Sequence, residues 1–201
     1  PTGKDTKLLS GGGLNLGGKW SPNGKFVAMS LERQGNVDIY LLDSTGKILR
    51  RLTEDPAIDV SPTWSPDGDR LAFVSSRSGS PQIYVLELAS GKARRLTYSG
   101  GYNTSPGWSP AGDKIAYTGR VNGRFQIFTI GVQGGDPQQL TVNSGDNEDP
   151  AWSPDGRFIA FTSNRKGRYQ LYIMQASGEN QQRLTGSGGD DTNPSWSPRL
   201  E

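Results

Sequence analysis

Acidic side chains gather in short segments that recur along the chain. Three acids lie within four residues at Asp146, Glu148 and Asp149, and two more are adjacent at Asp190 and Asp191. Carboxylate oxygens are the ligands that Ca²⁺ prefers, and converging carboxylates also attract a cationic protein segment. No segment has the spacing of an EF-hand loop, and single Asp residues commonly form turns in tight loops. These five acids are therefore candidate Ca²⁺ ligands, with a cationic partner segment as the alternative.

The absence of two residue types excludes most enzyme chemistry. The chain contains no His and no Cys, which removes Ser-His-Asp triads, Cys nucleophiles and Cys/His zinc sites. Residues 13–19 imitate a phosphate-binding loop, but Trp20 stands where Ser or Thr is required. Residues 107–111 half-match a nucleophile elbow, but no His is present to activate Ser109. We expect a protein without catalytic activity.

Composition narrows the class further. The 201 residues include 28 Gly and 13 Pro, only 32% are hydrophobic, and the formal net charge is +2. This composition is typical either of disorder or of many short strands joined by tight turns. The near-neutral balance gives no reason to expect a nucleic-acid partner, and no apolar run is long enough to insert in a membrane. Because residue 1 is Pro, we expect a processed or truncated polypeptide.

A repeat of 44 residues decides between these two readings. Each of the five Trp residues begins Trp-Ser-Pro, and Gly, Ala, an apolar-aromatic pair and Leu-Thr follow at fixed offsets. The Trp residues are Trp20, Trp64, Trp108, Trp152 and Trp196. Each unit predicts four short strands, here called A to D, bounded by turn residues. Four antiparallel strands in a unit of this length are typical of a β-propeller blade.

The predicted fold is an all-β propeller with four complete blades and partial strands at both ends. We expect Trp64, Trp108 and Trp152 to be buried between blades, and Trp20 and Trp196 to be less buried. A stray outer strand is expected at residues 7–9 and an inner strand at residues 193–196. The unit boundaries are 1–15 for the outer strand and loop, 16–59, 60–103, 104–147 and 148–191 for the blades, and 192–201 for the last inner strand.

The two end blades of such an array would each leave an apolar face exposed to water. An arc of four blades would expose the outer faces of its end blades, which we expect to carry Val27, Met29, Ile159 and Phe161. Large exposed apolar faces are disfavoured on a monomer in water. Either the arc tightens, or end blades of different chains pack together; we favour self-association, because closing four blades would change every interface.

The repeat, from Trp-Ser-Pro-Asp-Gly to Leu-Thr, resembles that of the TolB propeller family of the Tol-Pal system, as does the final Trp-Ser-Pro strand. The resemblance covers essentially the whole chain and implies a fragment of a six-bladed propeller. It further implies a periplasmic location in a Gram-negative bacterium. The implied function is non-catalytic binding of Pal, the peptidoglycan-associated lipoprotein.

The resemblance places the Pal contacts three to six residues before each Trp, in the loops that connect strand D to the next strand A. The positions are Leu14, Asn15, Gly17, Asp59, Val60, Asn103, Thr104, Asn147, Glu148, Asp191 and Thr192. Two other functions remain open: an accessory propeller of a prolyl-oligopeptidase-like hydrolase, and an excised or engineered repeat array with no function of its own.

Overall fold

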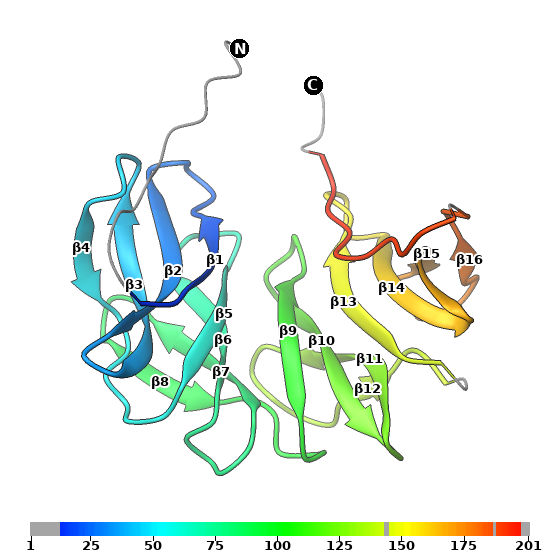
Figure 1. The fold of residues 1–201 in the computed structure, drawn as a ribbon, viewed down its shortest axis with the longest axis horizontal. Helices are drawn as coiled ribbons and strands as arrows, with labels where there is room; N and C mark the ends of the chain where they lie inside the picture. Colours follow the sequence, from blue (N-terminus) through cyan, green and yellow to red (C-terminus); the bar gives the residue numbers. More distant parts are fainter. Residues whose placement is uncertain (1–12, 143–144, 187, 198–201) are drawn as a thin grey trace.

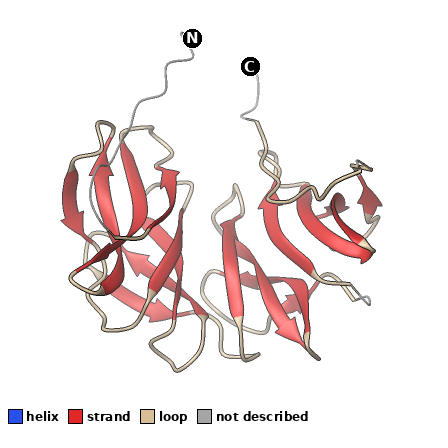
Figure 2. Cartoon of the chain, in the orientation of Figure 1, coloured by secondary structure: helices blue, strands red, loops and turns tan. Residues whose placement is uncertain are grey.

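The fold consists of four sheets, each with four antiparallel strands that follow one another in the sequence. The computed structural model describes residues 13–142, 145–186 and 188–197. All helix or strand structure assigned in this part of the chain is β-strand (Figure 2). The prediction of an all-β array of four-stranded blades is confirmed. The same described residues include no helix long and apolar enough to cross a membrane.

The strands occupy equivalent places in the four blades. Blade 1 contains β1 (Asn15–Trp20), β2 (Phe26–Arg33), β3 (Asn36–Asp43) and β4 (Ile48–Arg51). Blade 2 contains β5 (Asp59–Trp64), β6 (Arg70–Ser75), β7 (Gln82–Glu87) and β8 (Lys92–Arg95). Blade 3 contains β9 (Asn103–Trp108), β10 (Lys114–Val121), β11 (Arg124–Gly131) and β12 (Gln138–Gln139). Blade 4 contains β13 (Asn147–Trp152), β14 (Phe158–Lys166), β15 (Arg168–Gln175) and β16 (Gln182–Arg183). In Figure 1 the first strand of every blade lies on the inner side of the arc.

Residues of the repeat make the same hydrogen bonds in the turns and at the outer edge of each blade. At the first turn of blade 2, the amide of Gly68 donates to the carbonyl of Ser65 (3.0 Å), with φ of +78° at the glycine. This left-handed conformation explains the glycine, because other residues adopt it at a cost. At the outer edge, the Leu-Thr motif supplies Thr97, whose hydroxyl accepts from the amide of Ile83 (2.9 Å). Thr53, Thr141 and Thr185 make the same bond in the other blades.

Apolar side chains between neighbouring blades form the core. Between blades 2 and 3, Ala72 and Ile83 pack against Trp108 and Tyr117. Trp64 and Trp108 are buried, as predicted, whereas Trp152 is only half-buried. Each buried indole also donates across the interface to the residue before the preceding Trp, and the distance from Trp64 Nε1 to the Lys19 oxygen is 2.8 Å. Trp20 and Trp196 are exposed, as predicted.

The arc does not close on itself. Contacts between strands of different blades join blade 1 to 2, 2 to 3 and 3 to 4, and no described strand of blade 1 contacts blade 4. Figure 1 shows the resulting opening between β1 and β13. The tightened arc, which was the less favoured of the two alternatives, is therefore not what this structure shows, and self-association stays a prediction.

The predicted exposed faces need correction. Ile159 and Phe161 pack against blade 3, so they are not on the open face of blade 4. Val27 does lie on the side of blade 1 away from blade 2, but it is buried in a cluster with Leu31 and Tyr40, and Met29 packs beside them. The open face of blade 4 instead exposes Leu184, whose equivalents Leu96 and Leu140 are buried by a following blade.

The predicted terminal strands have different outcomes. Residues 193–196 form no strand, because no strand B of the same unit lies beside them in the described structure. They still follow the inner wall: the amide of Asn193 donates to Thr162 Oγ1 (3.2 Å), and the indole of Trp196 donates to the carbonyl of Ala151 (2.9 Å). The strand predicted at residues 7–9 lies outside the described residues.

Candidate partner-binding site

The inner strands line an open channel with a cavity of about 750 Å³. Equivalent positions of β1, β5, β9 and β13 line it, together with the segment that follows blade 4; the lining includes residues 16–19, 60–63, 105–108, 149–152 and 193–195. Most of these side chains are small or polar, and Lys19 and Asp149 are the charged members. The volume lies in the range of ligand sites, so the channel has room for a peptide side chain or a short extended segment.

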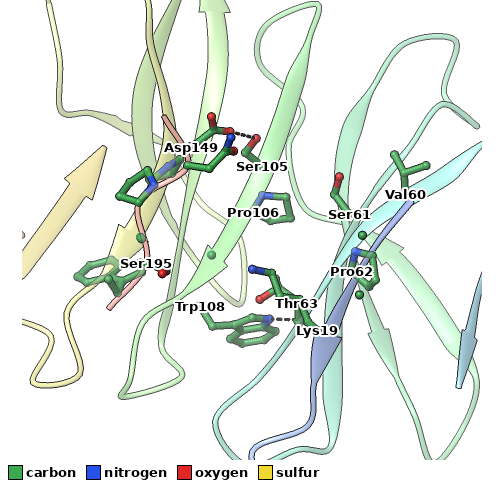
Figure 3. Close-up of a pocket in the computed structure, with 18 of the residues that line it drawn as sticks. Lys19, Val60, Ser61, Pro62, Thr63, Ser105, Pro106, Trp108, Asp149 and Ser195 are labelled. Atoms are coloured by element: carbon green, nitrogen blue, oxygen red, sulfur yellow. Dashed lines mark hydrogen bonds between the residues drawn. The ribbon is translucent and has the colours of Figure 1, made fainter. Parts of the chain in front are cut away.

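A β-bulge shapes the wall at the same height in every blade. The register with the neighbouring strand shifts within each inner strand, for example between Val60 and Thr63 in β5. The residue at the bulge has φ between +49° and +56°; these residues are Gly17, Ser61, Ser105 and Asp149. Asn193, at the equivalent place in the segment after blade 4, has φ of +55°. For a residue other than glycine this conformation costs about 1 kcal/mol or more. Figure 3 shows Ser105 and Asp149 facing each other at this level, joined by a hydrogen bond of 2.9 Å.

The loops from strand D to strand A and the turns from strand B to strand C lie at the same end of the channel, here called the mouth face. Antiparallel order requires this arrangement, and hydrogen bonds join the two sets of segments. Ser76 donates its amide to the carbonyl of Ile58 (3.2 Å), and Arg120 does the same to Tyr102 (2.9 Å). The predicted contact positions therefore all belong to one end of the molecule.

Three of the predicted contact residues have buried side chains, of which one forms an ion pair within its blade and two donate hydrogen bonds to the preceding blade. Asp59 is fully buried, and its Oδ2 lies 2.8 Å from Arg77 Nη2. Asn103 donates to Gln82 Oε1 (2.8 Å), and Asn147 donates to Gln126 Oε1 (3.0 Å). Burial raises the pKa of Asp59 above its usual value, with Arg77 acting in the opposite direction. These three side chains position the mouth loops and are not available to a partner.

The remaining predicted positions are accessible. Leu14, Asn15, Gly17 and Thr192 are exposed, and Val60, Thr104, Glu148 and Asp191 are half-buried.

The candidate Ca²⁺ ligands make hydrogen bonds within the protein. Asp146, Glu148 and Asp149 lie close enough to influence one another, but the described residues include no group of three or more acids that could hold a metal ion. Their oxygens accept from neutral donors instead: Glu148 Oε1 from the Tyr169 hydroxyl (3.1 Å), and Asp190 Oδ1 from the Tyr169 amide (3.0 Å). Ca²⁺ binding by these acids stays a prediction from the sequence.

The pKa of Glu148 is raised above its usual value of 4.5, first by burial and then by the charges of Asp149 and Asp146. The folded state therefore binds a proton more readily than the unfolded state, so this residue favours folding most below pH 4.5 and loses that effect as the pH rises through the folded pKa. We expect Glu148→Gln, which keeps an oxygen for Tyr169, to raise the melting temperature at pH 7. The gain should vanish near pH 3. A thermal melt series would contradict this explanation if the gain were equal at both pH values.

Sequence reasoning missed a set of exposed apolar side chains on the mouth face. Tyr98 and Val142 are 73% and 81% exposed, and Ile58 and Tyr102 are also exposed. All four lie in the loops between strand D and strand A. The signal was available, because large apolar residues in loops otherwise rich in Gly, Ser and Asp have no role in a tight turn.

This architecture defines the class: consecutive four-stranded blades of one chain lie around a channel, which is a β-propeller arrangement built from the 44-residue repeat. The family model described as the TolB beta propeller domain, PD40, matches residues 1–129 and 105–201. The chain belongs to this family.

Comparisons with individual proteins agree with this family assignment. A curated relative, the Tol-Pal system protein TolB of Anaeromyxobacter dehalogenans, is 44% identical over 47 residues, which is 23% of this chain and 11% of that protein. The crystal structure of TolB from Acinetobacter baumannii superposes with a TM-score of 0.85 and 33% identity, covering 96% of this chain and 48% of that one. The chain therefore spans about half the length of that TolB structure, and the segment matched in the curated relative covers about a tenth of that protein.

A structure from a study of two prolyl endopeptidases also superposes, with a TM-score of 0.63, 15% identity, and coverage of 87% of this chain and 30% of that one. At this identity the likeness concerns the propeller fold alone.

Proposed function

We propose that the chain is a partner-binding propeller of the Tol-Pal system, and that it binds the peptidoglycan-associated lipoprotein Pal through its mouth face without catalysing a reaction. The relatives named as Tol-Pal system proteins support the assignment to that system. The channel and the loops around it are the proposed Pal-binding surface. The corresponding location is the periplasm of a Gram-negative bacterium, and the corresponding roles are outer-membrane integrity, protein transport and cell division.

The observation that carries the proposal is the exposure of large apolar side chains in the mouth loops. Exposed apolar side chains that gather on one face, with polar groups around them, are typical of protein interfaces. Ile58, Tyr98, Tyr102 and Val142 have this character, and tyrosine is among the residues most favoured in binding hot spots. An accessory role beside a hydrolase domain has only the shared fold in its favour.

Calorimetric titration with soluble Pal, prepared without its lipid, tests the proposal. We expect a one-to-one complex, and Glu148→Lys should weaken it at least tenfold because this half-buried side chain lies at the start of β13, next to the mouth loops. Asp69→Lys is the matched control, since Asp69 is an exposed acid in the turn between β5 and β6, at the opposite end of the channel. Absence of binding to the unaltered chain, or equal effects of the two substitutions, would contradict the proposal.

A further inference from the structure

The mouth face is divided into two chemically different parts. Five equivalent positions, 44 residues apart, precede the inner strands: Leu14, Ile58, Tyr102, Asp146 and Asp190. The three on blades 1, 2 and 3 are apolar, and the two at blade 4 and after it are acidic. Two residues later, the equivalent positions are apolar on blades 1 and 2 (Leu16 and Val60), acidic on blade 4 (Glu148), and threonine on blade 3 and after blade 4 (Thr104 and Thr192).

We name the first part the apolar sector, which consists of Leu14, Leu16, Ile58, Val60 and Tyr102. Four of these side chains are exposed, and Val60 is half-buried. Leu16 and Val60 also line the channel, so the sector continues from the rim into the cavity. Tyr102 is held in place by an edge contact with Phe125, with ring centroids 5.7 Å apart. An ordered apolar surface of this kind suits apolar side chains of a partner.

We name the second part the acidic sector, which consists of Asp146, Glu148, Asp149 and Asp190. Each accepts a hydrogen bond from a neutral group: the amide of Phe125 to Asp146, the Tyr169 hydroxyl and amide to Glu148 and Asp190, and the Ser105 hydroxyl to Asp149. Within the described residues, no Lys or Arg forms an ion pair with any of the four. The four carboxylates therefore have no ion-pair partner among the described residues, and the cations of the nearby turn between β14 and β15, Arg165, Lys166 and Arg168, form none with them.

The two sectors meet at blade 3, where Tyr102 contacts Phe125 and the amide of Phe125 donates to Asp146 (2.9 Å). Their other members lie apart along the arc, with the apolar ones in or just before β1 and β5 and the acidic ones in β13 and the loops around it (Figure 1). The channel cavity lies between them, because Leu16 and Val60 line it on one side and Asp149 on the other. Figure 3 shows Val60 and Asp149 on opposite walls of this cavity.

We infer that the mouth face recognises an extended partner segment in which apolar residues alternate with Lys or Arg. Successive side chains of an extended chain point to opposite sides, so alternation presents one apolar flank and one cationic flank. The apolar flank lies against the apolar sector, and the cationic flank faces the acidic sector. Charge complementarity selects this partner over an acidic or a wholly polar segment. The inference rests on the proposed function for its surface, and adds the chemistry of the partner.

Three labelled eight-residue peptides test this, measured by fluorescence anisotropy: alternating Leu and Lys, alternating Ser and Lys, and alternating Leu and Glu. We expect the Leu-Lys peptide to bind at least tenfold more tightly than either of the others. Ile58→Ser combined with Tyr102→Ser should reduce its affinity at least fivefold and remove most of its advantage over the Ser-Lys peptide. Glu148→Gln combined with Asp190→Asn should weaken binding similarly and flatten its dependence on salt.

Matched controls lie away from the mouth. Leu49→Ser removes a side chain that is 46% exposed on the outer strand β4, close to the 54% of Ile58, and Asp69→Asn removes an acid at the opposite end. Neither control should change binding. Equal affinity of the Leu-Lys and Leu-Glu peptides, unchanged affinity in both double variants, or displacement of the bound peptide by millimolar Ca²⁺ without an equal effect of Na⁺ at matched ionic strength would overturn the inference.

Titration of the same variants with soluble Pal separates the two proposals. If the unaltered chain binds the Leu-Lys peptide but not Pal, the assignment of Pal fails and the inference stands. If Pal binds equally well to the unaltered chain and to both double variants, the proposed function stands and the inference fails.

Discussion

Replacing Trp108 by alanine is expected to lower the free energy of unfolding by about 3–5 kcal/mol. The ring is only 7% exposed and packs among blade 2 and blade 3 residues. Its indole donates to the carbonyl of Thr63 (3.2 Å), and the guanidinium of Arg70 lies 4.9 Å from the ring centroid. The substitution therefore opens a cavity and removes a hydrogen bond between blades. Equilibrium unfolding in urea provides the measurement.

Trp20→Ala is the control, because this Trp occupies the same repeat position but is 52% exposed. We expect it to cost less than about 1 kcal/mol. Similar losses in the two variants would contradict the view that contact with the preceding blade is what stabilises these Trp residues.

Replacing Arg77 by methionine is expected to cost about 3 kcal/mol, because it leaves the fully buried carboxylate of Asp59 without its cation. Part of the loss is packing, since the guanidinium of Arg77 also lies over Phe73 and Tyr84, at 5.5 and 4.9 Å from the ring centroids. Methionine retains some of this packing, so the charge effect should dominate. Urea unfolding at pH 7 measures the total.

The repeat itself supplies the test of the electrostatic explanation. Asn103 and Asn147 occupy the position of Asp59 in the next two blades, and both are buried with hydrogen-bonded amides. Adding Asp59→Asn to Arg77→Met should therefore recover more than half of the lost stability. A double variant no more stable than Arg77→Met would show that packing alone explains the cost.

Much of the fold could be predicted from the sequence because the repeat fixes the spacing of turns and strands. Trp64 marks both an inner strand and an interface with the preceding blade, so its burial followed from the architecture. The repeat did not show which neighbouring blade the other strand side chains face. Alternation in β14 shows that Ile159 and Ala160 face opposite sides, but only the assembled arc shows that Ile159 faces blade 3.

The candidate site was predictable only in part. The sequence located the mouth loops, and it identified Asp59, Asn103 and Asn147 as polar residues within them. Their partners Arg77, Gln82 and Gln126 lie 18 to 21 residues away and meet them only after strands B and C have paired. Local sequence therefore gave no means of separating these buried residues from accessible ones such as Glu148.

Hydrogen exchange of the chain with and without soluble Pal tests the central claim most directly, since it locates the binding surface residue by residue. We predict slower exchange in the loops at residues 54–60, 98–104 and 145–149, which surround the channel mouth. The turns at residues 65–68, 109–112 and 153–156, at the other end of the channel, should be unchanged. Protection of those turns or of the outer strands β4 and β8, with the mouth loops unaffected, would contradict the account.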